Sequence, residues 1–490
     1  MMHAYLRPLR VQHSRGVSVA AGGALSMVGL LAQGVLRFAT IWLVGRVAGP
    51  VLAGTVAAAI ATASLLVLLW PTTAGSAASK YIAVARGGGD TAEIGAVAAH
   101  FRRRATLTGI LVAALSIPVW VLMQDGRLLD GLCVAVLALA YSGYSFVRGV
   151  LFGAQQMARA TTWDVASSVL GLLALGAALL AGVGGGALLL PVAGAYALYS
   201  LASWPWRLPE HDPLSRAVRR ELDHFVALGA VGSLASSGFL QLAMIVARAT
   251  DPEGAGQFAA AMSTATPASM LAAALSLVLL PSLSEALGSG DRDRFRIMSD
   301  RANRVLITVM VATFGSLALG ARLVMTILWG HRFAPDSLLF PLLVLALLAS
   351  NSSVASVNAL AARSRRGVLI TTLASIAGLL TGVVVWWLFI GRLGVLAVAV
   401  GYLVGAVVTN VVPLAAEWRV GAHAWAGLAA RSVTAVAVAC VGLYVQRAFD
   451  ISIWLDPVVV AVFLLGWLLA SRRDLASLHL RLPGRRPTAR

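Results

Sequence analysis

The sequence has 490 residues, of which 59% are hydrophobic and only 12% are charged, with a formal net charge of +18. Soluble globular chains carry roughly 25% charged residues, so this composition excludes a soluble protein of this length. The basic residues are almost all arginines and stand in short clusters between apolar runs, which is typical of membrane-protein loops. We therefore expect an all-α polytopic membrane protein with no nucleic-acid partner.

A window of about 19 residues predicts fourteen transmembrane helices. The first six predicted spans cover residues 17–45, 51–73, 106–124, 128–152, 161–183 and 187–206. The next six cover residues 224–248, 255–283, 303–327, 337–361, 367–390 and 394–416, and the last two cover 427–447 and 452–470.

Two stretches of the chain are near copies at a constant offset of 202 residues, each at a corner between two apolar spans. Arg46, Pro50, Ala53, Gly54, Ala57, Ala58, Ala59, Thr62 and Ala63 recur as Arg248, Pro252, Ala255, Gly256, Ala259, Ala260, Ala261, Thr264 and Ala265. Duplicated membrane halves are typical of transporters.

The repeat predicts two pseudo-symmetric six-helix lobes followed by two further helices. We expect an N-terminal lobe at residues 1–207, a cytoplasmic linker at 208–223, a C-terminal lobe at 224–418, and helices 13 and 14 with a basic tail at 419–490.

The arginine distribution predicts the orientation. If the N-terminus is cytoplasmic, 30 basic residues fall on the cytoplasmic side and 7 on the other side. Positive charge is retained on the cytoplasmic face, so we expect a multi-pass protein of the cell membrane with both termini in the cytoplasm.

Polar side chains within the spans are the candidate site. In the first span Ser26, Gly29, Gln33, Arg37 and Thr40 follow one another at steps of three or four, which places them on one helix face. A central Arg costs about 2.5–3.5 kcal/mol on insertion scales and normally faces a cavity or a partner. Of the acids within spans, depth favours Asp130 over Asp164 as the partner of Arg37.

The second repeat carries a matching stripe. Ser237 and Gln241 lie in the seventh span, and Gln241 aligns with Arg37 at an offset of 204. Two such stripes would suit a substrate cavity between two lobes. The substrate-binding candidates are therefore the polar residues Gln33, Arg37, Ser237 and Gln241 of these stripes, together with Asp164, Asn351 and Asn358. The alternative is that serines and amides only join helices by hydrogen bonds.

Other chemistry is not indicated. Lys80, in the run from Gly75 to Tyr81, lacks the second Gly and the Ser or Thr of a nucleotide-binding loop. Cys133 and Cys440 fall inside apolar spans, and His residues show no metal-ligand spacing. We expect no catalytic residue, no cofactor and no metal ion, and hence not an enzyme.

Two short motifs carry a family resemblance. The run Leu43–Pro50 followed by Gly54, and the run Leu279–Ser284 leading into Gly290 and Asp291, resemble the multidrug/oligosaccharidyl-lipid/polysaccharide (MOP) flippase superfamily. The resemblance implies two six-helix lobes facing a cavity that opens alternately to either side, with a thirteenth and fourteenth helix in some members.

Among its branches the sequence looks most like polysaccharide transporters and lipid II flippases. That likeness implies a polyprenyl-diphosphate-linked glycan as substrate, membrane lipids as surroundings, and polysaccharide-assembly proteins as partners. Two alternatives stay open: a cation-coupled drug or metabolite antiporter of the same superfamily that uses Asp164, and a membrane glycosyltransferase or polymerase, for which no sizeable outer loop is predicted.

Overall fold

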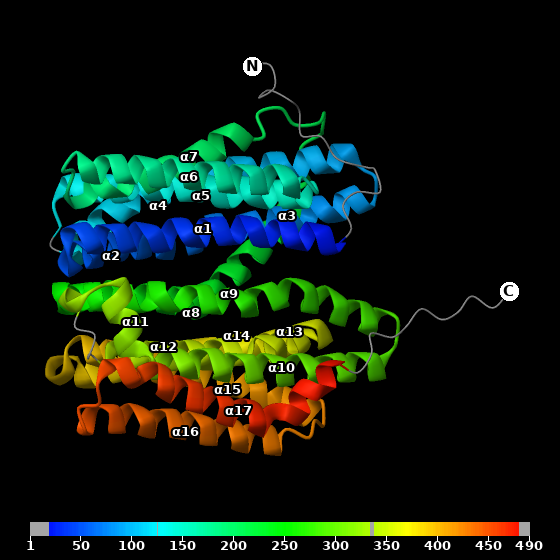
Figure 1. The fold of residues 1–490 in the computed structure, drawn as a ribbon. Helices are drawn as coiled ribbons and strands as arrows, with labels where there is room; N and C mark the ends of the chain where they lie inside the picture. The colour runs from blue at the N-terminus through cyan, green and yellow to red at the C-terminus, as the bar shows by residue number, and fades with distance from the viewer. Residues whose placement is uncertain (1–18, 125, 334–337, 480–490) are drawn as a thin grey trace. The chain divides into compact units, whose positions relative to one another are not determined.

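The computed structural model describes residues 19–124, 126–333 and 338–479, and within these residues every regular element is helical. Figure 1 shows these helices along the chain. The first eight are α1 (Val19–Ala48), α2 (Pro50–Leu68), α3 (Pro71–Gly87), α4 (Thr91–Gln124), α5 (Leu128–Gly153), α6 (Met157–Leu180), α7 (Leu190–Ser203) and α8 (Arg216–Thr250). The others are α9 (Pro252–Gly288), α10 (Arg292–Leu319), α11 (Ala321–Leu328), α12 (Leu339–Ser352), α13 (Val354–Arg363), α14 (Arg365–Leu393), α15 (Val395–Val420), α16 (Ala426–Ala448) and α17 (Asp456–His479). Short 3₁₀ turns occupy Gly185–Leu189, His331–Phe333 and Ile453–Leu455.

Thirteen helical segments of the described chain are long and apolar enough to cross a membrane, and each overlaps one predicted span. The remaining predicted span, 255–283, is occupied by the 37-residue helix α9. The prediction of an all-α polytopic membrane protein is therefore confirmed. Large apolar side chains such as Leu111 and Trp387, which are 67% and 80% exposed, suit a surface that faces lipid.

The second predicted span, residues 51–73, is divided between two helices, although we expected one continuous helix. Pro71 cannot donate a backbone hydrogen bond, and α2 ends at Leu68 before α3 begins at this proline. Helix α3 then packs backbone to backbone against α5. A Cβ on Gly75 would clash with the carbonyl of Ser145, and a Cβ on Gly149 would clash with the backbone of Gly75. The glycine in the run around Lys80 thus serves close helix packing.

The chain forms two compact units. The first comprises Met1–Pro267 together with Trp386–Val398, and the second comprises Ala268–Val385 together with Ala399–Arg490. Helix α8 belongs to the first unit, where it packs along α2. The lobe boundary at residue 207, which follows the sequence repeat, stays a prediction.

Within the first unit the two repeated corners touch each other. A Cβ added to Gly54 would lie 2.7 Å from the backbone nitrogen of Gly256, its counterpart in the repeat. In return, a Cβ on Gly256 would overlap the carbonyl oxygen of Pro50. Both glycines are therefore needed for the approach of α2 to α9.

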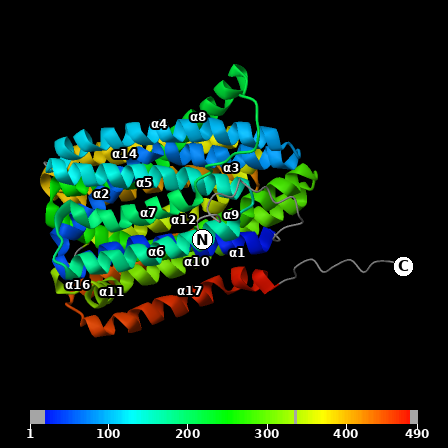
Figure 2. The same ribbon diagram turned by 90° about the horizontal axis from the view of Figure 1, so that it is seen from above.

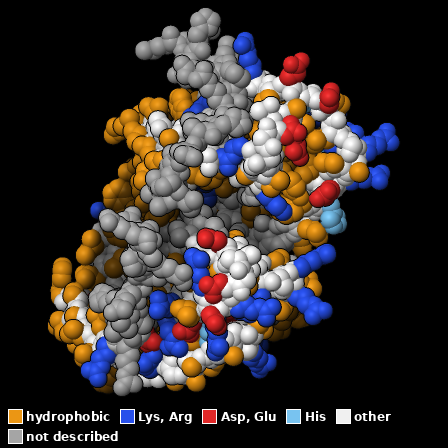
Figure 3. All heavy atoms as spheres, turned by 90° about the vertical axis from the view of Figure 1, so that its right-hand side faces the viewer, with side chains coloured by type: hydrophobic (Ala, Val, Ile, Leu, Met, Phe, Trp, Pro, Cys, Tyr) orange, Lys and Arg blue, Asp and Glu red, His pale blue; other side chains and the backbone are white. Residues whose placement is uncertain are grey.

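In the first unit α5 lies between α4 and α7 and packs against both, as Figure 2 shows from above. Helix α6 packs against α1 and α7. Figure 3 looks onto the helix ends at the right of Figure 1, where Lys and Arg side chains gather, while hydrophobic side chains cover the flanks. The terminal arginines counted for the orientation, from Arg7 to Arg15 and from Arg481 to Arg490, lie outside the described residues.

Candidate functional site

The polar face of α1 packs against α6 within the first unit. Gly29 makes this possible, since a Cβ at this position would lie 2.5 Å from Oδ2 of Asp164 on α6. Nearby, the hydroxyl of Thr161 donates to the carbonyl of Leu25 at 2.7 Å. Gly29, which the sequence analysis placed on the polar face of this helix, therefore leaves room for the carboxylate of Asp164 against α1.

Asp164 is buried, with 1% of its side chain exposed, and three polar side chains surround it. Gln33 donates from Nε2 to Oδ1 at 3.2 Å, and the Tyr144 hydroxyl donates to the same oxygen at 2.9 Å. The guanidinium of Arg148 on α5 lies 3.4 Å from Oδ2. A buried carboxylate of this kind needs both the opposite charge and the hydrogen bonds.

Arg37 lies one helical turn beyond Gln33 on α1 and has a different environment. Its Nε donates to the hydroxyl of Tyr196 on α7 at 3.0 Å. Its guanidinium carbon lies 4.9 Å from the ring centre of Tyr141 on α5, within reach of a cation–π interaction. Among the described residues, the structure records no ion pair between Arg37 and a carboxylate.

Tyrosines connect the two charged groups. The ring of Tyr144 lies 4.9 Å from that of Tyr196 and 4.7 Å from that of Tyr199, while Tyr141 lies 5.0 Å from Tyr196. We call Gln33, Arg37, Arg148 and Asp164 together with Tyr141, Tyr144, Tyr196 and Tyr199 the first-unit polar cluster. Arg148 and Asp164 neutralise each other, so the cluster as a whole retains the positive charge of Arg37.

The predicted partner of Arg37 was wrong. Asp130 lies at the start of α5 and accepts a hydrogen bond from the backbone nitrogen of Gly186 at 2.8 Å, which fixes the 3₁₀ turn before α7. Asp164, the other candidate, is bound by Arg148. Depth along the membrane was therefore a poor guide, because it did not show which helices are neighbours.

Five members of the cluster, Arg148 and the four tyrosines, were not among the predicted site residues. Arg148 was counted among the cytoplasmic basic residues because it stands near the end of an apolar run, yet its side chain is only 17% exposed. Tyr196 and Tyr199 gave no signal beyond an apolar helix. Their spacing of three residues to each other, and that of Tyr141 to Tyr144, could have indicated two facing aromatic stripes.

The stripe of the second repeat is less enclosed. Gln241, the counterpart of Arg37, is partly buried and Ser237 is exposed. No hydrogen bond of either side chain is recorded within the described chain. The symmetry of the repeat thus does not extend to the packing of these two positions.

Asn351 and Asn358 instead take part in contacts between helices of the second unit. Asn351 on α12 donates to the Ser269 hydroxyl at 3.0 Å, and Asn358 on α13 donates to the Ser276 hydroxyl at 2.8 Å. Both serines lie on α9, seven residues apart like the asparagines. These amides therefore hold α12 and α13 against α9.

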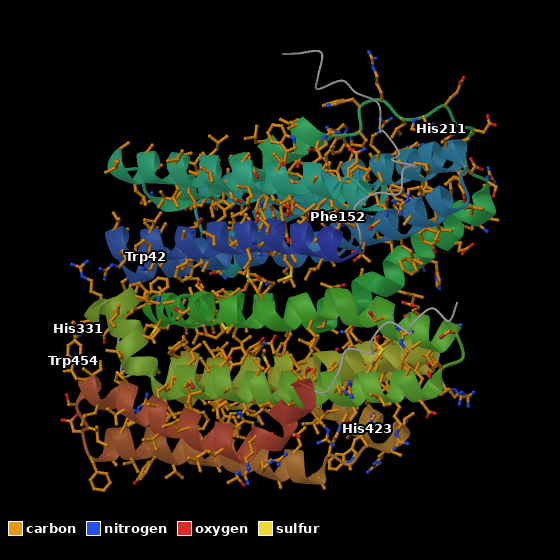
Figure 4. All side chains as sticks on the ribbon, turned by 45° about the vertical axis from the view of Figure 1, so that its right-hand side comes forward. Trp42, Phe152, His211, His331, His423 and Trp454 are labelled. Carbon is orange, nitrogen blue, oxygen red and sulfur yellow. The ribbon has the colours of Figure 1, made fainter. Side chains whose placement is uncertain are left out.

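Two buried ion pairs of the second unit also went unrecognised. Arg322 on α11 contacts Asp456 at 2.6 Å, and Arg363 on α13 contacts Glu417 at 3.0 Å, with both carboxylate side chains fully buried. Figure 4 labels His331 and Trp454 at one end of this unit and His423, which lies 3.3 Å from Glu417, at the other. These pairs fix helix ends within the second unit.

Chemistry of other kinds is not evident in the described residues. They contain no group of three or more His, Cys, Asp or Glu side chains that could hold a metal ion. Cys133 is buried and Cys440 is exposed, and both are free thiols. The first-unit polar cluster consists of charged, amide and phenol side chains that are connected by hydrogen bonds, an ion pair and ring contacts.

The described chain is therefore a multi-pass helical protein with a buried, charged cluster inside its first unit. Comparison with solved structures gives the particular fold. The chain is similar to the lipid II flippase MurJ in an inward closed conformation, with a TM-score of 0.70 and 12% identity over 93% of this chain and 99% of that one. It is also similar to an inward-facing multidrug resistance MATE transporter of the MOP superfamily, with a TM-score of 0.64 and 15% identity over 81% and 98% of the two chains.

A third similar structure is a MOP superfamily transporter from Pyrococcus furiosus Vc1 (DSM3638), described as having a binding pocket of reverse polarity. Its TM-score is 0.58, with 15% identity over 82% of this chain and 95% of that one. No protein-family model and no curated protein sequence matches the chain. The chain therefore has the same fold as these MATE and MurJ structures, which is the fold that the resemblance of the sequence motifs led us to expect.

Proposed function

We propose that this protein is a flippase that moves a polyprenyl-diphosphate-linked oligosaccharide or cell-wall precursor from the cytoplasmic to the outer leaflet by alternating access. The observation that carries the proposal is the environment of Arg37, whose guanidinium has a neutral tyrosine hydroxyl as its hydrogen-bond partner. The charge of Arg37 is thus available to an anionic group. A diphosphate accepts charge-assisted hydrogen bonds from a guanidinium in a fixed geometry.

The physical task of a flippase fits such a site. Each sugar hydroxyl costs several kcal/mol to bring into hydrocarbon without a hydrogen bond, and a bare diphosphate costs more. In the proposed alternating-access path, hydrogen bonds from Arg37 to the diphosphate would offset part of that cost, while the polyprenyl tail stays in the bilayer. An inside-negative potential favours outward movement of an anion by about 2.3 kcal/mol per charge per 100 mV.

The comparisons support the proposal at the level of fold. One similar structure is named a lipid II flippase, and another is described by the reversed polarity of its binding pocket. The first helix of this chain carries a cation, Arg37, whose recorded hydrogen-bond partner is the hydroxyl of Tyr196. As proposed partners we add the proteins that assemble the glycan at the cytoplasmic membrane.

The test replaces Arg37 by Gln in the full-length protein reconstituted in vesicles. A fluorescent polyprenyl-diphosphate disaccharide is added on one side, and its arrival in the other leaflet is measured by accessibility to a membrane-impermeant quencher. We expect Arg37→Gln to abolish flipping and Arg37→Lys to retain part of it. Unchanged flipping by Arg37→Gln at equal protein level would exclude Arg37 from substrate binding.

A drug or metabolite antiporter is the second candidate, and a specific observation favours it: Asp164 is a buried carboxylate held by Gln33 and Tyr144 inside the spans. In that case Asp164 exchanges a cation, and Asp164→Asn abolishes efflux of a cationic dye from loaded vesicles. The flippase proposal expects no dye efflux by the unmodified protein. The two functions are therefore separated by one assay on the parent protein.

A further inference from the structure

A groove on the surface of the first unit has no role in the proposed transport. It lies where α4 and α7 both pack on α5, and its volume is about 830 Å³. This is within the range of roughly 300–1,000 Å³ that is usual for small-molecule sites. Residues of α4, α5 and α7 line it, among them Arg103, Gly109, Val136, Gly143 and Ala197, and Trp204 and Trp206 follow α7.

Small residues make the groove. A Cβ on Gly109 of α4 would lie 3.2 Å from Cβ of Ser142, and one on Gly143 of α5 would lie 3.1 Å from the hydroxyl of Ser200 on α7. Helices α4 and α7 therefore approach α5 closely and leave a furrow between them. From Arg102 to Gly109 the furrow extends about 10 Å along α4, at 1.5 Å per residue.

The walls of the groove behave as an apolar surface. The hydroxyls of Thr106, Ser142 and Ser200 donate to carbonyls of their own helices at 2.9, 2.7 and 2.7 Å. Their hydrogen atoms are thus engaged, and the surface offered to a ligand consists mainly of methyl and methylene groups. An acyl chain is the occupant that a lipid bilayer supplies for such a surface.

One end of the groove is cationic. Arg104 is neutralised by Asp223 at 2.5 Å, and Arg102 donates to the carbonyl of Pro205 at 2.9 Å. Arg103 is exposed, and the structure records no ion pair or hydrogen bond of its side chain within the described chain. Trp204 and Trp206 lie beside this end, and tryptophan is enriched at the level of lipid headgroups.

We propose that this groove binds one anionic phospholipid, with an acyl chain between α4 and α7 and the headgroup phosphate at Arg103. The second donor is Arg102, which has guanidinium nitrogens beyond those that hold the α7–α8 linker. An anionic lipid is favoured over a zwitterionic one because the net charge at this mouth is positive. The site is separate from Arg37 and does not depend on the proposed flippase function.

The test measures lipid binding to the purified, delipidated full-length protein by native mass spectrometry. The probes are phosphatidylglycerol and phosphatidylcholine with identical acyl chains. We expect phosphatidylglycerol to bind about fivefold more tightly, the factor that corresponds to about 1 kcal/mol per basic residue near an anionic headgroup. Arg103→Gln removes this preference, whereas Arg366→Gln, at an exposed arginine of α14 in the second unit, retains it.

The apolar part of the groove is tested by filling it. Ala197→Leu and, independently, Val136→Phe lower the affinity for both lipids, while Ala177→Leu on an exposed face of α6 does not. Two filling variants are used so that misfolding of one, detected as a lowered thermal transition, leaves the other informative. Equal binding of the two lipids by the parent protein, or parent-like binding by Arg103→Gln or by a folded filling variant, would overturn the proposal.

Discussion

The carbonyl oxygen of Pro50 occupies the space that a side chain on Gly256 would need. Pro50 begins α2 and Gly256 lies in the first turns of α9, so the contact joins the two copies of the repeat. Because the obstacle is backbone, a side chain cannot be accommodated by a change of rotamer. The sequence identity of the two corners thus reflects a shared packing requirement.

Gly256→Ala is expected to destabilise the protein, since overpacking in a close contact typically costs about 1–3 kcal/mol. The matched control is Gly176→Ala in α6, where a Cβ meets nothing within 4 Å. There the gain in helix propensity, about 1 kcal/mol, is expected to raise stability. Thermal unfolding of the purified variants gives the comparison, and a Gly256→Ala transition at or above that of the parent would contradict the packing argument.

Removal of Asp164 leaves the guanidinium of Arg148 buried without its counter-charge. Breaking a buried pair from one side typically costs about 3–5 kcal/mol, so Asp164→Asn is expected to lower the thermal transition strongly. The double variant Asp164→Asn with Arg148→Gln is expected to recover part of the loss. Additive losses in the double variant would show that the two groups do not interact.

Tyr196→Phe tests how Arg37 is positioned. The variant keeps the ring and removes the hydroxyl that accepts from Nε of Arg37. We expect a small change in stability, about 0.5–1.5 kcal/mol, and a marked loss of glycan flipping in the vesicle assay. Tyr199→Phe is the control, because the same ring cluster is kept and the Arg37 hydrogen bond is untouched. Parent-like flipping by Tyr196→Phe would remove the hydroxyl from the proposed mechanism.

Asn358→Ala distinguishes a structural from a substrate-binding role. Hydrogen bonds between membrane helices average about 0.6 kcal/mol, so a structural role predicts a slight loss of stability and normal flipping. Ser276→Ala removes the partner of the same bond and should then give the same result. Loss of flipping by Asn358→Ala at parent-like stability would restore the sequence-based prediction that this residue binds substrate.

Part of the candidate site could be read from the sequence. The periodicity of Gly29, Gln33 and Arg37 placed them on one face of α1, and the cost of polar groups in hydrocarbon marked that face as special. Asp164 was recognised as an acid within a span. The sequence did not reveal that Gln33 binds Asp164 or that Arg37 binds Tyr196, because both contacts join helices more than 130 residues apart.

The order and approximate positions of the apolar spans followed from the sequence alone, since hydrocarbon requires each crossing segment to satisfy its own backbone hydrogen bonds. Because of this rule, the length of each apolar stretch can be recognised in the sequence without knowing which helices pack beside it. The pairing of charges was decided only by tertiary structure: Arg148 reached Asp164 and Asp130 reached Gly186 because of which helices pack together and how closely glycines allow them to approach. Helix packing distances depend on the shapes of both partners, and no local pattern in one helix encodes them.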